Sequence, residues 1–357
     1  MKTIKYRAPF RPNVHRIVIS FIISMGVMFF LSVIITGEDR LLEYASIGKP
    51  YASMLRHGRH SDKKTVILLG DSNCRGLGKM LQHAIEKHGK SVEVQSWDYV
   101  CASMTDYYCI YHRALKYSPD LIIVSINWRG FAEEWIKTTW YFNRELSAFV
   151  PIEGQTPSQY NILRQRGINP VQHIQYKLFF LYRLYPMGYK AYVKDKFRTL
   201  FKLGKYGRKK DLVNLPKRLV LRRNKWSGKF IEYNTDPASH ASQFPMRITE
   251  SNKTLCAISA LSNAASKNGT TVLFFIWPMD IEYHKEMGSL NRAELQKSIE
   301  LVHEVIEKNN NEYCLDLSML FEDRHRAFKD SEGHCTLPAR RKIAATLAPE
   351  ILRIMQN

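Results

Sequence analysis

Hydrophobic and polar positions along the chain follow two patterns that predict strands and helices in turn. Five short stretches have the apolar or alternating pattern of strands: 65–69, 91–96, 120–126, 270–276 and 314–317. Five longer stretches have apolar residues three and four positions apart, as amphipathic helices do: 75–88, 107–117, 251–268, 293–309 and 339–355. Strands that alternate with helices form a parallel sheet covered on both faces. We therefore expect an α/β domain over residues 63–150 and 251–357, with sites at the carboxyl ends of its strands.

The N-terminus has a basic leader followed by one long apolar run. Residues 1–16 contain lysines and arginines but no acid, and residues 17–36 carry no charge. A run of about 20 apolar residues is long enough to cross a bilayer. Because the leader is basic, the positive-inside rule keeps it in the cytoplasm and puts the rest of the chain outside. We expect an uncleaved single-pass anchor joined by a linker over residues 37–62; a cleaved signal peptide is the alternative.

Residues 151–250 interrupt the alternation of strands and helices. The part from 190 to 229 is rich in lysine and arginine and has only two acids, Asp195 and Asp211. We expect a basic, mostly helical insertion in the α/β domain. Its charge fits either an ordinary solvated face or a surface that lies on anionic lipid or holds an acidic polymer.

The whole chain is strongly basic, with 357 residues and a net charge of +20. Such a charge predicts an acidic partner, and the sequence has no nucleic-acid-binding fingerprint, which favours anionic lipid or an acidic polymer. The six cysteines lack metal-binding spacing, so neither a metal nor a cofactor is expected. Cys101 with Cys109, or Cys314 with Cys335, could form disulfides outside the cytoplasm; free thiols are the alternative.

A candidate nucleophile, Ser72, follows the first predicted strand and precedes the first predicted helix, in the sequence Gly-Asp-Ser at 70–72. A serine at such a turn lies near the unpaired N–H groups and positive dipole of a helix, which suits attack on a carbonyl. Asp and Ser are also common helix caps, so the stretch alone fits either role. Asp71 is too close to Ser72 along the chain to complete a triad with it.

A serine nucleophile needs a base and a group that orients that base. His334 lies in a polar loop directly before the last predicted helix, and Asp330 and Glu332 precede it on the same loop. An acid at this position can hold the imidazole through its Nδ1–H.

Three short sequence motifs, called blocks here, together resemble those of the SGNH (GDSL-type) hydrolase superfamily. They are Gly-Asp-Ser at 70–72, Asn127 after a later strand, and His334 before the final helix. The resemblance spans about residues 63–355, apart from the insertion. It implies a flavodoxin-like, three-layer α/β fold with helices on both faces of a parallel sheet. It also implies that Ser72 is the nucleophile, that His334 is the base, and that Ser72, Asn127 and a second-block residue form the oxyanion hole.

Three blocks depart from the family pattern. The third block, Gly-x-Asn-Asp, reads Ser-Ile-Asn-Trp at 125–128, which keeps only Asn127. The second block has no glycine, so a backbone N–H of Cys101 or Ala102 is expected to serve instead. The last block, Asp-x-x-His, has one extra residue here, and Asp330 is expected to orient His334, with Glu332 as the alternative.

The anchor and the basic insertion make the chain similar to membrane-tethered members of this superfamily that modify cell-envelope polymers. Those members include the teichoic-acid D-alanylation protein and alginate-type O-acetyltransferases. We expect a serine acyltransferase or esterase outside the cytoplasm, acting with an acyl donor, a carbohydrate or polyol-phosphate acceptor and a multi-pass membrane acyltransferase. The alternatives are a plain carboxylesterase or lipase, and a catalytically silent scaffold that binds an acidic polymer or a membrane partner.

Overall fold

The computed structural model describes residues 15, 18–24, 26–27, 63–98, 102–133, 144–152, 157–179, 232, 236–309, 311–321 and 327–356. The chain divides into two units, one of residues 1–47 and 179–212 and one of residues 48–178 and 213–357. In the first unit the described residues between 15 and 27 are helical and expose large apolar side chains such as Phe21 and Ile22. Most of the predicted anchor, residues 17–36, lies outside the described residues. Among those that are described, no helix has the length and hydropathy needed to span a bilayer.

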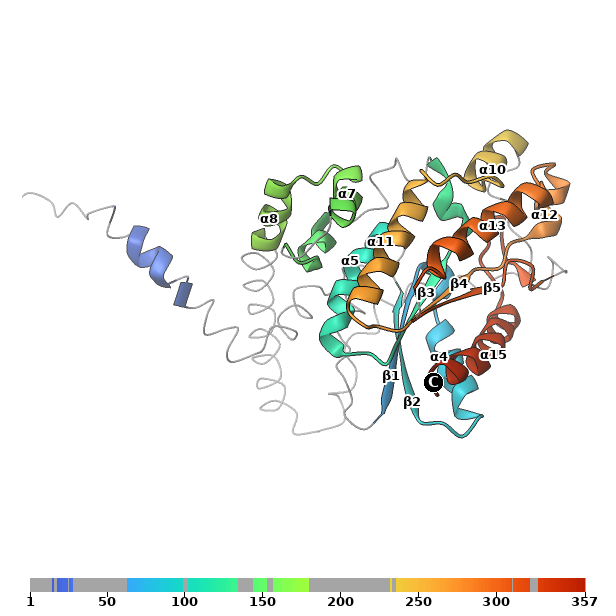
Figure 1. The fold of residues 1–357 in the computed structure, drawn as a ribbon, viewed down its shortest axis with the longest axis horizontal. Coiled ribbons are helices and arrows are strands. Elements are labelled where there is room, and N and C mark those ends of the chain that lie inside the picture. Colours follow the sequence, from blue (N-terminus) through green and yellow to red (C-terminus); the bar gives the residue numbers. More distant parts are fainter. Residues whose placement is uncertain are drawn as a thin grey trace, which may run out of the picture. The chain divides into compact units, whose positions relative to one another are not determined.

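The second unit is built on a five-stranded sheet in which all strands are parallel (Figure 1). The strand order is β2-β1-β3-β4-β5. The strands are β1 (Lys64–Gly70), β2 (Val92–Asp98), β3 (Leu121–Ile126), β4 (Val272–Ile276) and β5 (Glu312–Asp316). Each of the five predicted strands is present, within two residues of its expected ends, and the predicted α/β fold with a parallel sheet is confirmed.

Helices cover both faces of this sheet (Figure 1). Two of them pack together on one face, namely α4 (Leu77–Glu86) and α15 (Leu337–Ile354). The other face carries α5 (Met104–Ala114), α11 (Lys253–Lys267) and α13 (Arg292–Ile306). In a doubly wound sheet, the helices that connect parallel strands pack on both faces of the sheet, and the helices of this domain follow that arrangement.

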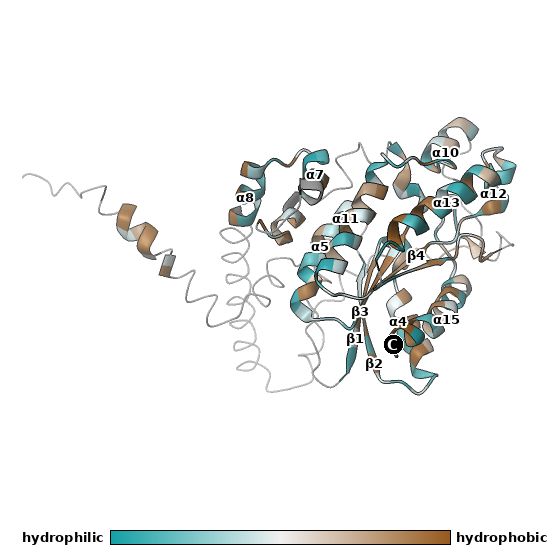
Figure 2. Cartoon of the chain, in the orientation of Figure 1, coloured by the Kyte–Doolittle hydropathy of each residue, from teal (hydrophilic) through white to brown (hydrophobic). Residues whose placement is uncertain are grey.

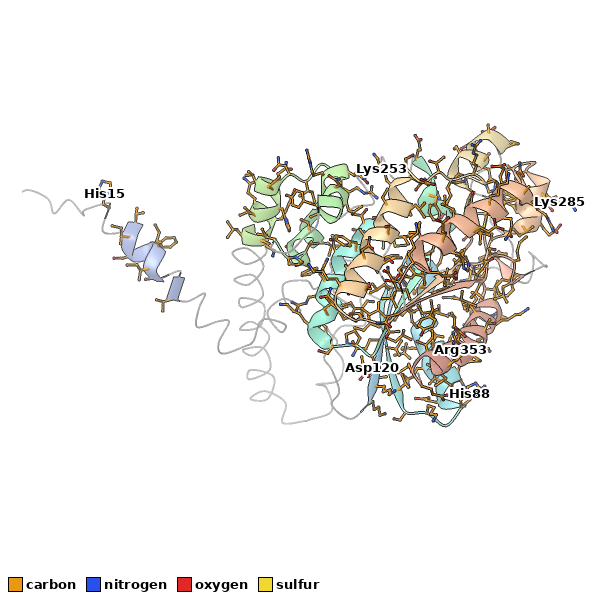
Figure 3. The ribbon with its side chains drawn as sticks, viewed as in Figure 1. His15, His88, Asp120, Lys253, Lys285 and Arg353 are labelled. Carbon is orange, nitrogen blue, oxygen red and sulfur yellow. The ribbon has the colours of Figure 1, made fainter. Side chains whose placement is uncertain are left out.

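The core lies between the sheet and its helices. Val66, Leu68, Ile123 and Phe275 belong to one buried cluster with apolar residues of α4 and α15. Side chains alternate along a strand, so the intervening residues, such as Ile67, point to the other helix layer and are also fully buried. Figure 2 shows predominantly hydrophobic β3 and β4 inside helices of mixed hydropathy. In Figure 3, the labelled Lys253 on α11 and Lys285 on α12 (Ile281–Glu286) lie at the periphery of the domain, where both are exposed.

Helix α5 begins three residues before the predicted start at 107, because a capping box defines its N-terminus. The Ser103 side chain accepts a hydrogen bond from the Asp106 N–H, and the Asp106 carboxylate accepts one from the Ser103 N–H. Two orphan N–H groups are thereby satisfied, which stabilises the earlier start. The periodicity of apolar residues locates the helix but not its cap.

The remaining described elements are short. They include the helices α7 (Pro157–Gln165), α8 (Pro170–Phe179), α10 (Pro237–Gln243) and α12 (Ile281–Glu286), and the 3₁₀ helices η1 (Ser72–Cys74), η2 (Leu115–Tyr117), η3 (Trp128–Phe131) and η5 (Arg144–Phe149). The described parts of the predicted insertion therefore contain helices, and most of its basic stretch lies outside the described residues. The cysteines Cys109, Cys314 and Cys335 are free, so neither of the two disulfides that the sequence allowed is formed.

Candidate active site

The candidate nucleophile Ser72 opens the 3₁₀ helix η1 at the carboxyl end of β1. Gly70 is required at this turn, because a Cβ there would lie 2.3 Å from the Cβ of Cys74. The helix is capped by Asp71, whose side chain accepts a hydrogen bond of 2.9 Å from the Asn73 N–H. Since Asp71 performs the capping, the side chain of Ser72 is available for a different partner.

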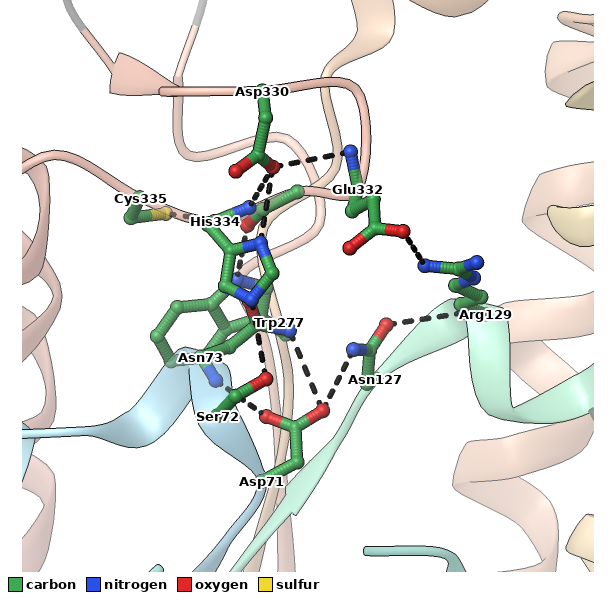
Figure 4. Close-up of polar contacts among 11 residues, drawn as sticks. Asp71, Ser72, Asn73, Asn127, Arg129, Trp277, Asp330, Glu332, His334 and Cys335 are labelled. Atoms are coloured by element: carbon green, nitrogen blue, oxygen red, sulfur yellow. Dashed lines mark hydrogen bonds and ion pairs between the residues drawn. The ribbon is translucent and has the colours of Figure 1, made fainter. Parts of the chain in front are cut away.

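That partner is His334, and the contact is the one predicted from the sequence. The Oγ of Ser72 lies 3.1 Å from Nε2 of His334, and Nδ1 of His334 lies 3.0 Å from Oδ1 of Asp330 (Figure 4). Asp330 is buried, whereas Ser72 and His334 are partly exposed. The structure thus brings together Ser72 and a histidine loop more than 250 positions away in the chain, in the geometry of a serine triad.

The loop that carries His334 is held by hydrogen bonds of its own. Oδ1 of Asp330 also accepts the backbone N–H groups of Glu332 and His334, each at 3.1 Å. Trp277, which follows β4, donates its Nε1–H to the carbonyl of Gly333 at 3.1 Å. Gly333 has a φ of +84°, which favours glycine, and lets the loop turn tightly before His334. The extra residue relative to Asp-x-x-His is accommodated in this turn.

Glu332, the alternative acid, has another partner. Its Oε1 lies 2.8 Å from Nη1 of Arg129, which belongs to η3 after β3 (Figure 4). The Nδ1 of His334 is therefore met by Asp330 and not by Glu332. The ion pair joins the histidine loop to the segment that follows Asn127.

The surroundings of His334 favour its protonated form. Burial opposes protonation, but the hydrogen bond and the charge of Asp330 outweigh it, and the charges of Asp71 and Glu332 act in the same direction. The net result is a pKa of His334 above its ordinary value of 6.5. A raised pKa strengthens this imidazole as a proton acceptor for Ser72.

Asn127 lies at the carboxyl end of β3 and caps η3, accepting the N–H of Arg129 on its Oδ1 at 3.1 Å. Its Nδ2 donates to Oδ2 of Asp71 at 2.8 Å. Asp71 is buried, and burial raises the pKa of its carboxyl group, while the hydrogen bonds from Asn127 and Asn73 oppose the increase. The side-chain amide of Asn127 is thus oriented by a carboxylate next to Ser72. Sequence reasoning excluded Asp71 as a triad acid and missed this contact.

The second-block residues are only partly described. Ala102 is buried directly before α5, and the N–H of Ser103 is already bonded to Asp106 at 2.8 Å. Ala102, Asp71 and Asn127 line a common small pocket at the carboxyl end of the sheet. Cys101, the other predicted N–H donor, lies outside the described residues.

Asn127 also lines another pocket. Five of its twelve lining residues have aromatic rings, and three belong to the histidine loop. It is lined by Asn127, Trp128, Phe244, Trp277, Pro278, Met279, Asp280, Tyr283, His284, Ser331, Glu332 and Gly333. A separate cavity of about 360 Å³ is formed by residues of α7, α11 and α13 and contains none of the candidate site residues. The two small pockets that Asn127 lines are therefore the ones that adjoin the candidate site, although the separate cavity is larger.

Comparisons with known proteins identified no relative of this chain. The chain matches no model of a known protein family, and its sequence matches no curated protein. Among the residues that the structure describes, no three His, Cys, Asp or Glu side chains come together as a metal site.

Proposed function

We propose that the chain is a membrane-anchored serine acyltransferase or esterase of SGNH type that adds or removes an acyl group on a cell-envelope polymer. The observation that carries the proposal is a pair of consecutive hydrogen bonds. Oγ of Ser72 lies 3.1 Å from Nε2 of His334, and Nδ1 of His334 lies 3.0 Å from Oδ1 of Asp330. A nucleophile, a base and an orienting acid in this order are the requirement for acyl transfer through serine. A catalytically silent scaffold would not need these two hydrogen bonds.

In the proposed reaction Nε2 of His334 takes the proton of Ser72 while the serine oxygen attacks an acyl carbonyl. Asp330 holds Nδ1–H and stabilises the imidazolium that forms. Collapse of the tetrahedral intermediate breaks the bond to the donor's leaving group, which takes the proton from His334, and leaves an acyl group on Ser72. Water or an acceptor hydroxyl then attacks this ester and passes its proton to His334, which returns it to Ser72.

The negative charge on the intermediate requires hydrogen-bond donors. The donors in this proposal are the N–H of Ser72, the N–H of Cys101 or Ala102, and the side-chain amide of Asn127. An amide nitrogen carries two hydrogens, and the bond to Asp71 uses one of those on Asn127. The second hydrogen is assigned to the oxyanion.

The topology supports a relationship to the SGNH superfamily. The strand order β2-β1-β3-β4-β5 is a flavodoxin-like order, and ligands of such sheets bind at the carboxyl ends of the strands near the switch point. Ser72 follows β1, Asn127 follows the adjacent β3, and His334 precedes α15. This is the sequence of blocks that the resemblance implies. Because this support comes from topology, the function depends on the site chemistry.

The location and partners in the proposal come from the sequence. The basic leader and the uncharged run at 17–36 favour a single-pass anchor with the α/β domain outside the cytoplasm. The net charge of +20 suits an acidic acceptor such as a teichoic acid or a uronic-acid polymer. A multi-pass membrane acyltransferase is the proposed source of the acyl group.

Intact-protein mass spectrometry with a fluorophosphonate tests the nucleophile. We expect one adduct on the wild-type chain and none on Ser72→Ala, because the reagent reacts with an activated serine. Ser266→Ala, which changes an exposed serine of α11 that lines none of these pockets, is a control and should still be labelled. An unlabelled wild-type chain would contradict the proposal.

Hydrolysis of p-nitrophenyl acetate separates an esterase from a transferase. An esterase should hydrolyse this ester rapidly without any partner. A transferase excludes water and waits for its acceptor, so its turnover should be slow until a polyol or sugar is added. Both forms should lose turnover with Ser72→Ala.

A further inference from the structure

Two buried histidines that the proposed acyl transfer does not use are in contact with each other. His240 of α10 and His284 of α12 are 1% and 2% exposed. Nε2 of His240 lies 3.1 Å from Nδ1 of His284, and the centroids of the two rings are 4.7 Å apart. His284 also lines the pocket that Asn127 forms with residues of the histidine loop, which we call the His284 pocket.

One ring nitrogen of His284 is left for a ligand. Nδ1 faces Nε2 of His240 and also Oγ of Ser289, at 3.2 Å. Nε2 has no hydrogen-bond partner among the residues that the structure describes. Buried polar atoms are nearly always hydrogen-bonded, so a nitrogen without a protein partner on a pocket wall indicates that the pocket holds a polar group.

Both histidines are uncharged at neutral pH. Burial lowers the pKa of His284 below its ordinary value of 6.5, and the charge of His240 acts in the same direction. Burial and the charge of Arg129 lower the pKa of His240 in the same way. In a neutral ring, Nε2 of His284 carries either a hydrogen or a lone pair. A hydroxyl group can bond to it in either tautomer, because a hydroxyl both donates and accepts.

The His284 pocket is small, and its lining carries no positive side chain. The space within it is about 10 Å³, which is about the least that holds one water molecule or hydroxyl group. Its lining includes two acids, Asp280 and Glu332, and no lysine or arginine. A phosphate or carboxylate would therefore meet no cation of the lining, whereas a hydroxyl suits the neutral ring of His284.

The walls of the His284 pocket are bonded to residues that flank the triad (Figure 4). Asn127 donates to Asp71, directly before Ser72, at 2.8 Å. Trp277 donates to the carbonyl of Gly333, directly before His334, at 3.1 Å. The pocket thus adjoins both the amide assigned to the oxyanion and the loop that carries the base.

We propose that the His284 pocket binds a second hydroxyl of the acyl acceptor through Nε2 of His284, and so selects acceptors with two neighbouring hydroxyl groups. This inference rests on the proposed acyl transfer, in which the first hydroxyl attacks the acyl carbon on Ser72. The bond from that carbon to Oγ of Ser72 breaks, and one to the acceptor oxygen forms. The attacking hydroxyl gives its proton to His334, which passes it to Ser72. The second hydroxyl keeps its proton and positions the first.

Two matched alcohols test the selection. The full chain in nanodiscs of neutral lipid receives p-nitrophenyl acetate with either propylene glycol or propanol, which differ by one neighbouring hydroxyl. The ratio of acetyl ester to free acetate is measured by gas chromatography. We expect wild type to form about tenfold more ester with the glycol, as one added hydrogen bond allows. Equal yields from the two alcohols would overturn the proposal.

His284→Phe should abolish the preference, because it keeps an aromatic ring and removes the nitrogen; thermal unfolding checks that the variant folds. His303→Phe is the matched control. His303 lies on α13, contacts Glu307 at 3.0 Å and lines none of the three pockets. It should keep the wild-type preference, and equal losses in the two variants would contradict the role of His284.

NMR of the histidine ring nitrogens tests binding without turnover. In the Ser72→Ala chain with isotope-labelled histidine, propylene glycol should shift the signals of His284, which His284→Phe assigns. Unmoved signals would overturn the pocket. Fluorophosphonate labelling of the wild-type chain reports on the nucleophile separately. Shifted His284 signals in a chain that is not labelled would support the hydroxyl site and contradict the acyl transfer.

Discussion

The two halves of the candidate site are built in different ways. On the base side, Asp330 lies on the same loop as His334 and binds both its ring and its backbone N–H, at 3.0 and 3.1 Å. On the oxyanion side, Asn127 comes from a different strand and is oriented by Asp71, a residue next to the nucleophile. The base half is therefore a local structure, whereas the oxyanion half depends on long-range packing of β1 against β3.

This difference affects the electrostatics as well as the geometry. Asp330 stabilises a positive charge on His334, which the proposed reaction would create. Asp71 is a carboxylate bonded to the same amide that would stabilise a negative charge. In the base half, the carboxylate of Asp330 has one electrostatic role, which is to stabilise a positive charge. In the oxyanion half, the amide of Asn127 has two, because it is bonded to a carboxylate and would also stabilise the oxyanion. Substitutions in the two halves should have different signatures in rate and in pH dependence.

The largest effect on turnover is expected for Asp330→Asn, in the base half. The amide keeps the size of the side chain but favours the wrong tautomer of His334, and triads lose about 10⁴-fold in kcat from such a change. Because His334 acts as a base only when neutral, the wild-type kcat/KM should rise with pH through a pKa above 6.5. Removing the negative charge lowers that pKa, so the rise should move to lower pH. Hydrolysis of p-nitrophenyl acetate across the neutral range measures both effects.

Stability gives an independent measure of the same contact. The folded pKa of His334 is raised, so the stabilisation is complete below the unfolded pKa and disappears as pH rises through the folded value. Asp330→Asn should therefore lower the unfolding temperature more in acid than in alkali. A variant with near-wild-type turnover and an unmoved pH profile would show that Asp330 does not orient the base.

The base half was also the part that sequence could predict. Asp330 and His334 are four residues apart, and local spacing restricts which acid can reach the ring. The strands were predictable for a similar reason, since buried runs such as Leu121–Ile126 are apolar almost throughout. The contact of Asn127 with Asp71 was not predictable, because it depends on the register of β1 and β3 and on side-chain rotamers. The partner of Glu332 likewise required the position of Arg129.

An intermediate effect is expected for Asn127→Ala on the oxyanion side. Loss of one oxyanion donor lowers kcat by about 10²- to 10³-fold, with a smaller change in KM. Asn73→Ala is the matched control, because Asn73 also bonds Asp71 through its side chain, at 3.4 Å, but has no assigned role in the oxyanion hole. Its kcat should change little. Equal losses in the two variants would mean that the asparagines act through Asp71 alone.

The pH dependence of stability should also distinguish this half from the base half. The folded pKa of Asp71 is raised, so ionised Asp71 disfavours the folded state as pH rises above the unfolded pKa. Asn127→Ala removes a donor that opposes this shift. The variant should therefore lose more stability at neutral pH than in acid, which is opposite to the trend for Asp330→Asn. Thermal unfolding at several pH values tests the contrast.

The smallest effect is expected for Glu332→Gln, which breaks the ion pair between the histidine loop and Arg129. The two side chains are 33% and 14% exposed, and pairs of this kind contribute about 1 kcal/mol or less, so kcat should fall only about threefold. Glu332 also raises the pKa of His334, so the pH profile should shift slightly downward. Glu294→Gln, which removes a carboxylate paired with Lys297 on α13, is the control and should leave the profile unchanged. A loss as large as that of Asp330→Asn would instead make Glu332 the orienting acid and reverse the assignment within the histidine loop.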